Sequence, residues 1–378
     1  MISPRKHIRP IIDASLDLPT PINLSYIWNF GSILGLILGM QIITGLLLTI
    51  HYSPHVDTAF LSVIHITRDV SWGWILRNLH ANGASMFFIL IYIHILRGIT
   101  YISFKKTKPW IIGVTIYILT MATAFIGYLL PWGQIRFWGA TVITNLFSAL
   151  PYVGEPIVLW IWGGFAVRGP TLTRFFALHF LLPFILIALS ILHLLFLHET
   201  GSRGPLGAQT NIIKTPFHIH FSSKDTLGFV IIIFILFILA RFYPNFFNDP
   251  ENFIPANPLV TPTHIKPEWY FLWAYAILRS IPNKLGGVVC IFAAILLLYT
   301  LPKTKIYQKP IPISTPSYSI ILTAIRIFVT LTWIGSNPVE DPYITLGILT
   351  TLTYFLLPLT LFIPKNKFYH GGRLVQRI

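Results

Sequence analysis

Two long apolar segments with matched histidines limit most strongly how this chain can fold. Residues 77–101 and 174–200 are each long enough to cross a bilayer as a helix, and each contains two histidines fourteen residues apart. The histidines are His80, His94, His179 and His193. At about 100° and ~1.5 Å per residue, fourteen residues return to nearly the same helix face and rise ~21 Å. Each helix therefore presents two imidazoles on one face at two levels.

These histidines favour metal ligation over simple packing. A single histidine in an apolar helix is often a hydrogen-bonded core residue, but burying four matched ionisable groups in a membrane is costly without a function. Zinc would normally need a third or fourth ligand, often cysteine or carboxylate, and the two segments offer none beside the histidines. Two imidazoles that face each other suit the two axial positions of a haem iron. The pattern predicts two haems, one at each level.

Composition indicates a membrane protein with several spans. The chain has 378 residues, of which 54% are hydrophobic and only 10% charged. Its net charge is +15, but the basic residues gather in a few loops, so we expect no nucleic-acid binding. The single cysteine, Cys290, excludes a disulfide framework, a cysteine-held iron–sulfur cluster and covalent c-type haem attachment. Any such centre would have to lie in a partner protein.

Eight apolar segments predict an all-α fold with eight transmembrane helices. They lie near residues 31–52, 79–102, 111–130, 175–197, 226–243, 286–301, 317–335 and 344–363. Lysine and arginine are concentrated before the first segment and after the second, fourth, sixth and eighth. The positive-inside rule then places both termini on the inner side. We divide the chain into a four-helix domain at 1–206, which holds both haems, and a second four-helix domain at 207–378.

This topology also predicts how the histidines pair. The second and fourth spans both run from outside to inside, so His80 should face His179 at the outer level and His94 should face His193 at the inner level. The first and third spans repeat the spacing with glycines, which are Gly31, Gly45, Gly113 and Gly127. Glycine would let a flat macrocycle approach the helix closely, although small residues also mediate helix packing.

Two long connections are expected on the outer side. Residues 131–170 are rich in Gly and Trp and predict short amphipathic helices on the membrane surface. Residues 244–284 contain seven prolines and are expected to form a long structureless loop. Together they should cover a pocket beside the outer haem.

The chain resembles the cytochrome b family, especially its mitochondrial members. The resemblance rests on the four histidines, the paired glycines, the tetrapeptide Pro267-Glu268-Trp269-Tyr270 and the segment WGATVITN at 138–145. Members of that family are the central subunit of ubiquinol–cytochrome c reductase. The resemblance implies two b haems, with His80 and His179 on the outer one and His94 and His193 on the inner one. It matches Arg77 and Arg97 to residues that bind the haem propionates.

The resemblance further implies two quinone sites. Residues matching the outer, ubiquinol-oxidising site are Phe125, Gly139, Ile143, Pro267, Glu268, Phe271 and Tyr275. Residues matching the inner, quinone-reducing site are Trp28, Asn29, Ser32, His198, Phe217, Lys224 and Asp225. Proton transfer is assigned to Glu268 outside and to His198 with Asp225 inside, because quinol oxidation releases protons and quinone reduction takes them up. From the residues alone, Glu268 could instead be incidental to an interfacial Trp-Tyr anchor, and His198 could be a helix-end cap.

The implied assembly is a homodimeric complex in the mitochondrial inner membrane, with membrane lipids, a Rieske iron–sulfur protein and a c-type cytochrome as partners. Both termini would lie in the matrix. A secondary transporter would need interrupted helices or a polar site at the midplane, and only the seventh segment carries a charged residue, Arg326, near its middle. Three positions depart from the family pattern by adding positive charge, namely Arg136, Arg168 and Arg203. Arg136 stands where a small polar residue is usual beside the outer quinone pocket.

Overall fold

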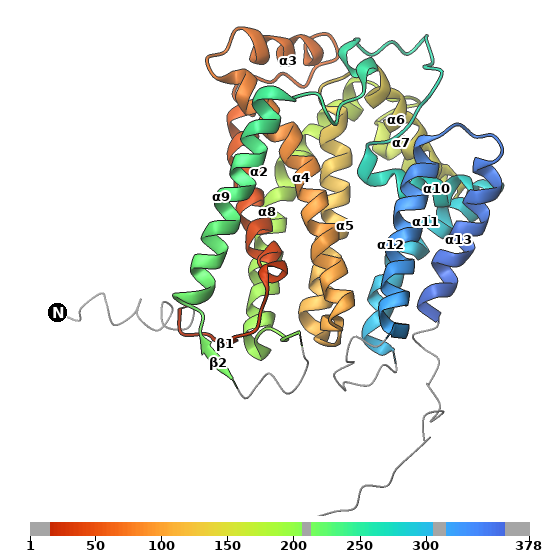
Figure 1. Ribbon diagram of the computed structural model, residues 1–378. Helices are drawn as coiled ribbons and strands as arrows, with labels where there is room; N and C mark the ends of the chain where they lie inside the picture. The colour runs from red at the N-terminus through yellow and green to blue at the C-terminus, as the bar shows by residue number, and fades with distance from the viewer. Residues whose placement is uncertain (1–15, 206–212, 305–314, 360–378) are drawn as a thin grey trace, which may run out of the picture.

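The computed structural model describes residues 16–205, 213–304 and 315–359, which form a helical bundle with one short two-stranded sheet (Figure 1). The α-helices are α2 (Phe30–Thr49), α3 (Ala59–Arg68), α4 (Gly73–Thr100), α5 (Thr107–Leu129), α6 (Gln134–Asn145), α7 (Gly154–Trp162), α8 (Gly169–Thr200), α9 (His220–Phe242), α10 (Leu272–Arg279), α11 (Lys284–Leu296), α12 (Thr315–Ser336) and α13 (Tyr343–Leu359). The 3₁₀ helices are η1 (Tyr26–Trp28), η2 (Ser103–Lys105), η3 (Leu146–Ala149), η5 (Pro250–Phe253), η6 (Trp269–Phe271) and η7 (Leu297–Lys303). The strands are β1 (Pro19–Pro21) and β2 (Lys214–Pro216).

The fold is the all-α membrane bundle that the sequence predicts. Among the described residues, seven helical segments are long and apolar enough to span a membrane, and they correspond to the first seven predicted spans. The eighth prediction falls on α13, which has 17 described residues, and its positions 360–363 lie outside the described residues. The predicted surface helices of 131–170 are α6 and α7.

The first four spans form one bundle in which α2 packs against α4 and α5 packs against α8. Helices α4 and α8 run in the same direction, while α2 and α5 run in the opposite one (Figure 1). The exposed face of α8 is apolar and includes Phe180, Leu181 and Ile191. Such side chains suit contact with lipid, since a helix that is hydrophobic all round belongs in a membrane.

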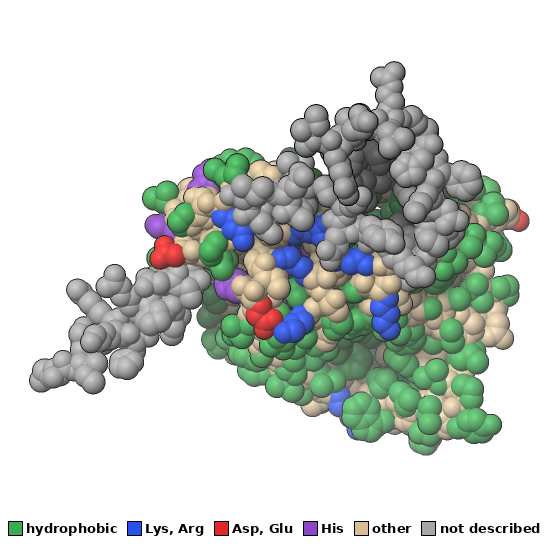
Figure 2. Space-filling model, turned by 90° about the horizontal axis from the view of Figure 1, so that it is seen from below, with side chains coloured by type: hydrophobic (Ala, Val, Ile, Leu, Met, Phe, Trp, Pro, Cys, Tyr) green, Lys and Arg blue, Asp and Glu red, His purple; other side chains and the backbone are tan. Residues whose placement is uncertain are grey.

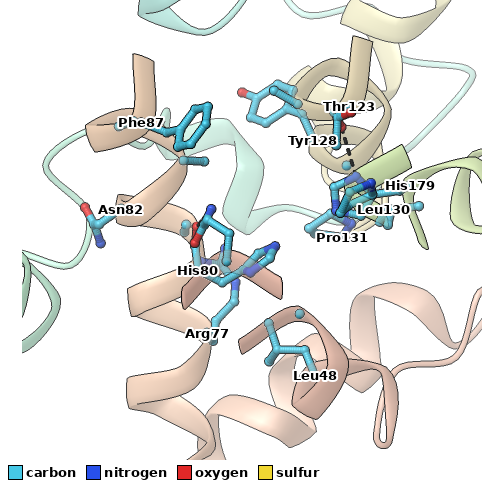
Figure 3. Close-up of a pocket in the computed structure, with 18 of the residues that line it drawn as sticks. Leu48, Arg77, His80, Asn82, Phe87, Thr123, Tyr128, Leu130, Pro131 and His179 are labelled. Carbon is cyan, nitrogen blue, oxygen red and sulfur yellow. Dashed lines mark hydrogen bonds between the residues drawn. The ribbon is translucent and has the colours of Figure 1, made fainter. Parts of the chain in front are cut away.

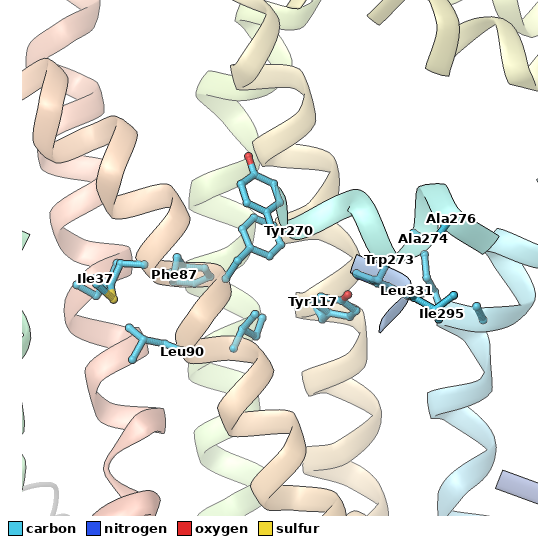
Figure 4. Close-up of a cluster of buried hydrophobic side chains, with 14 of the residues drawn as sticks. Ile37, Phe87, Leu90, Tyr117, Tyr270, Trp273, Ala274, Ala276, Ile295 and Leu331 are labelled. Carbon is cyan, nitrogen blue, oxygen red and sulfur yellow. The ribbon is translucent and has the colours of Figure 1, made fainter. Parts of the chain in front are cut away.

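The 244–284 connection is not structureless, and this corrects the sequence prediction. It contains η5, η6 and α10, and η6 and α10 contribute Tyr270, Trp273 and Ile277 to the main hydrophobic cluster (Figure 4). The Tyr270 ring stacks on Phe88 of α4 at 4.0 Å between ring centres. Its backbone carbonyl accepts a hydrogen bond of 2.5 Å from the Tyr92 hydroxyl. These contacts tie the chain after Glu268 to the wall of the four-helix bundle.

The two ends of the bundle differ in chemistry, and we call them outer and inner after the predicted topology. The outer end carries α3, α6 and α7, and the inner end carries the antiparallel pair β1–β2, in which Thr20 pairs with Thr215 (Figure 1). Seen from below, lysine and arginine side chains gather on the inner face (Figure 2). At this end of the bundle Lys106 donates to the carbonyl of Thr200 at the end of α8. This basic face supports the orientation that the loop charges predict.

Candidate functional site

The outer histidine pair lies in a cavity of about 250 Å³ (Figure 3). His80 enters it from α4 and His179 from α8, with their ring centres 6.2 Å apart. Arg77, Gly45 and Gly127 also line this cavity. Two spans that are distant in sequence therefore bring their first histidines together, with ring planes nearly perpendicular at 84°.

Hydrogen bonds fix the protonation of both outer imidazoles. His179 Nδ1 lies 2.9 Å from the Thr123 carbonyl, which can only accept, so Nδ1 carries the proton. His80 Nδ1 lies 3.0 Å from the Thr44 hydroxyl. Because that hydroxyl donates to the Met40 carbonyl at 2.8 Å, it accepts from His80. Both Nε2 atoms are then unprotonated, which is the form of imidazole that binds a metal.

The inner pair has the same separation but other neighbours. The ring centres of His94 and His193 are 6.4 Å apart. A guanidinium nitrogen of Arg97 lies 3.2 Å from His94 Nδ1, and guanidinium only donates, so here Nδ1 is the acceptor. His193 Nδ1 is buried without a hydrogen-bond partner among the described residues, since the nearby Pro109 carbonyl does not meet hydrogen-bond geometry.

Each predicted glycine lies against one histidine ring. A Cβ atom built on Gly31 would lie 3.2 Å from His94, one on Gly45 would lie 3.1 Å from His80, and one on Gly113 would lie 3.1 Å from His193. At Gly127 it would overlap the His179 ring. By contrast, a Cβ on Gly35 or Gly39 of α2 would meet nothing within 4 Å. The four glycines thus make room for the four imidazoles, a contact that spacing alone did not reveal.

The ring separations fit an iron held from both sides. With iron–nitrogen bonds of about 2.0 Å, and each nitrogen about 1.1 Å from its ring centre, two axial imidazoles would have centres ~6.2 Å apart. The described residues contain no group of three or more His, Cys, Asp or Glu side chains placed to hold a metal ion. The buried Nε of Arg97 also lacks a hydrogen-bond partner among the described residues, as a guanidinium meant for a haem carboxylate would. The residues present therefore fit a haem at each level.

Comparison with known proteins identifies the family. The model of the N-terminal region of cytochrome b, b6 and petB matches residues 15–201, and the model of the C-terminal region of cytochrome b, b6 and petD matches residues 255–355. A solved structure described as a hyperthermophilic respiratory complex III aligns over 96% of this chain and 97% of its own chain, with 33% sequence identity and a TM-score of 0.90. The chain is a member of the cytochrome b family.

Six of the seven residues that the cytochrome b resemblance placed in the outer quinone site line one small cavity. They are Phe125, Gly139, Ile143, Pro267, Glu268 and Phe271. The cavity measures about 10 Å³, so a quinol ring could enter only if its walls moved apart. Tyr275 lies apart from these six on α10, where its hydroxyl donates to the Ile265 carbonyl at 3.3 Å. It anchors the chain that leads into the cavity.

Glu268 has the electrostatic environment of a proton acceptor near neutral pH. Burial raises the pKa of its carboxyl to about 7, while the charges of Arg136 and Arg77 and the Tyr128 hydroxyl oppose this rise and the Asp249 charge adds to it. A carboxyl with that pKa can take up a proton and release it at working pH.

The residues that the resemblance matches to an inner quinone site gather mainly around the first turns of α2 and α9. The Ser32 hydroxyl donates to the Asp225 carboxylate at 2.7 Å, and Lys224 Nζ donates to the Leu24 carbonyl at 3.0 Å. Asn29 is only 6% exposed, and its side-chain nitrogen has no hydrogen-bond partner among the described residues. These groups form a polar inner corner of the bundle.

The remaining three predicted inner residues are Trp28, Phe217 and His198. The Trp28 indole donates to the backbone carbonyl of Arg203 at 3.1 Å. Arg203 is one of the three positions that depart from the family pattern, and its backbone helps to hold Trp28 in place. Phe217 lies just before α9 and stacks on Phe221 at 5.9 Å. His198 is exposed near the end of α8. The structure therefore brings Ser32 and Asp225 into contact, whereas the predicted pairing of His198 with Asp225 stays a prediction.

Sequence reasoning missed several neighbours of these sites. Thr44 and Thr123 hydrogen-bond the outer histidines, and neither has a sequence signal beyond its position in a span. Tyr128 directly follows Gly127 and lines both cavities. Asn252 is a further missed neighbour, because its side-chain amide donates to the Tyr128 hydroxyl at 2.8 Å. For Tyr128 the adjacent Gly127 was an available signal, and for Asn252 the sequence offered none.

Proposed function

We propose that this chain is the electron-conducting subunit of a ubiquinol–cytochrome c reductase. It would oxidise ubiquinol at the outer site, pass electrons across the membrane and reduce quinone at the inner site. The observation that carries this proposal is the pair of facing imidazoles at each level, 6.2 Å and 6.4 Å apart, on helices that run in parallel. The likeness to a chain of a respiratory complex III supports the assembly.

His80 with His179, and His94 with His193, would hold the two b haems. A haem held on both axial sides exchanges single electrons and leaves no iron position open to oxygen or substrate. The four glycines allow these rings their positions. Arg77 and Arg97 would bind haem propionates, because a buried guanidinium is well suited to a carboxylate.

At the outer site, Glu268 would accept a proton from the quinol hydroxyl. A pKa of about 7 lets the carboxylate act as a base near neutral pH and then release the proton outward. Phe125, Ile143 and Phe271 would enclose the ring and keep water from it. Proton release here and proton uptake inside, on opposite sides of the membrane, would couple electron flow to proton translocation.

At the inner site, the polar corner would bind and protonate the reduced quinone. Asn29 offers a buried donor without a partner among the described residues, suited to a quinone carbonyl oxygen. Asp225, held by Ser32, and His198 would supply protons from the inner surface. Lys224 would stabilise negative charge on the reduced ring, and Trp28 and Phe217 would provide its apolar walls.

The proposal includes location and partners. The chain would lie in the mitochondrial inner membrane with both termini in the matrix, in agreement with the basic inner face (Figure 2). Its partners would be a Rieske iron–sulfur protein, which takes the first electron from quinol, a c-type cytochrome and a second copy of the complex. The two domains, 1–206 and 207–378, would serve mainly haem binding and quinone-pocket formation respectively.

A redox titration of the visible spectrum of the purified complex tests this function. Two b-type components with different midpoint potentials are expected, and an inhibitor of the inner quinone site should shift only one of them strongly. A complex with a single b-type component, or with none that ubiquinol can reduce, would contradict the proposal.

A further inference from the structure

Three residues line both the outer histidine cavity and the small quinone cavity. They are Tyr128 at the end of α5, Arg136 in the first turn of α6 and Glu268 before η6. We call this set the shared wall. The charged side chains of Arg136 and Glu268 therefore lie beside both cavities.

Arg136 is held tightly within the shared wall. It is only 6% exposed, and its backbone N–H donates to the Asn252 side chain at 3.1 Å. Its guanidinium carbon lies 4.6 Å from the centre of the Tyr128 ring, a cation–π contact. Its Nε is buried without a hydrogen-bond partner among the described residues. A buried guanidinium with a free donor is costly unless an anion lies close to it.

Glu268 is the anion of the shared wall. Around it stand Arg136 from α6, Arg77 from α4, Tyr128 from α5 and the carboxylate of Asp249 before η5. Asp249 is already engaged, because Lys266 lies 3.6 Å from its carboxylate and the Glu251 N–H donates to it at 3.0 Å. Arg136 has the strongest influence of the two arginines on Glu268, opposing the effect of burial on its pKa. Glu268 is therefore the acidic side chain that lines both cavities together with Arg136 and feels its charge.

We propose that Arg136 is a positioning residue that holds the Glu268 carboxylate in the shared wall and keeps it ionised for proton transfer from quinol. The inference rests on the proposed function, because it concerns the same outer site. In the step concerned, the quinol O–H bond breaks, its proton forms the carboxyl O–H of Glu268, and the electron leaves to the iron–sulfur partner. Since the acceptor must start as carboxylate, Arg136 extends quinol oxidation to lower pH.

The test is the pH dependence of ubiquinol oxidation by the intact complex with Arg136→Ser, Arg136→Gln and Arg136→Lys. Serine is expected to assemble, because a small polar residue is usual at this position in the family. Loss of the positive charge should shift the acidic limb of the rate profile upward by about 1–2 pH units. Lysine keeps the charge but not the flat stacking on Tyr128, so its limb should stay near that of the wild type.

A purely structural role predicts another pattern, in which all three variants lose rate equally at every pH and the limb does not move. That result would overturn the inference and leave the proposed function intact. A wild-type complex that fails to oxidise ubiquinol at all would instead contradict the proposed function. Infrared spectra of the wild type give a second check that needs no substitution of Arg136. The carboxyl band of Glu268 is identified as the band that is lost in Glu268→Gln. A band showing Glu268 still protonated at pH 9 would overturn the inference.

Discussion

The two histidine pairs have nearly the same ring separation but different hydrogen-bond partners. Ring centres are 6.2 Å apart in the outer pair and 6.4 Å in the inner pair. In the outer pair both Nδ1 atoms have acceptors, the Thr44 hydroxyl and the Thr123 carbonyl. In the inner pair His94 Nδ1 faces the donor Arg97, and His193 Nδ1 has no partner among the described residues. Equal spacing along two helices sets where the rings lie, but not which nitrogen carries the proton.

This difference has a consequence for ligand binding. The Nδ1 hydrogen bonds of the outer imidazoles leave both Nε2 atoms unprotonated, which is the form that the proposed haem ligation requires. At the inner site Arg97 must turn away from His94 before Nδ1 can carry the proton and Nε2 can bind iron. A haem carboxylate would attract Arg97 to its new position. We therefore expect the outer site to be preorganised and the inner site to form together with its haem.

Removal of one histidine should have the largest effect. His179→Ala should abolish the outer b-type component, and His94→Ala the inner one, because each iron would lose an axial ligand. Reduced-minus-oxidised spectra and haem content per complex give the measurement, with about one haem lost in each variant. His65→Ala, an exposed residue of α3, is the control and should keep both components. Two intact components in His94→Ala would contradict the ligand assignment.

Glycine substitutions should also lower haem content at one level, but by less than the loss of a histidine does. A Cβ at Gly127 would overlap the His179 ring, whereas a Cβ at Gly113 would lie at a tight 3.1 Å from His193. Overpacking of this kind costs about 1–3 kcal/mol. Gly127→Ala should therefore reduce outer haem content more than Gly113→Ala reduces inner haem content, as measured by quantitative haem extraction. Gly35→Ala, where the added atom meets nothing within 4 Å, should leave both unchanged.

The contrast between the levels also shows what a sequence can reveal. Apolar segments predicted the spans, loop charges predicted the parallel helices, and fourteen-residue spacing then predicted which histidines lie opposite each other. The partners of Nδ1 depend on how neighbouring helices are rotated and on side-chain torsions, so Thr44, Thr123 and the contact of Arg97 with His94 could not be predicted. Arg136 stood out as a departure, but only three-dimensional packing placed it between two cavities. Proline content likewise suggested a loop where α10 forms part of the core.

Arg97→Gln should change the inner level alone. A positive charge about 8 Å from an iron centre, at an effective dielectric constant near 20, contributes roughly 2 kcal/mol, or about 90 mV for one electron. Because the charge favours the reduced state, its loss should lower the midpoint potential of the inner component by about 50–90 mV. Arg97→Lys should recover most of this shift. A redox titration that showed equal shifts in both components would rule out a local effect.

Thr44→Val should produce the smallest change, at the outer level and in the opposite direction. Valine has the shape of threonine but cannot accept the Nδ1–H of His80, which lies 3.0 Å from the Thr44 hydroxyl. A histidine ligand that loses such a bond becomes less basic and donates less charge to the metal, which favours the reduced state. A neutral hydrogen bond worth about 0.5–1.5 kcal/mol corresponds to a rise of roughly 20–60 mV in the outer midpoint potential.

The control is Thr173→Val. Thr173 is exposed and its hydroxyl donates to the Gly169 carbonyl of its own helix, so this change should leave both potentials unchanged. An outer potential that fell or stayed constant in Thr44→Val would mean that the Thr44 bond does not persist when the haem is bound, and the preorganisation of the outer site would then rest on Thr123 alone.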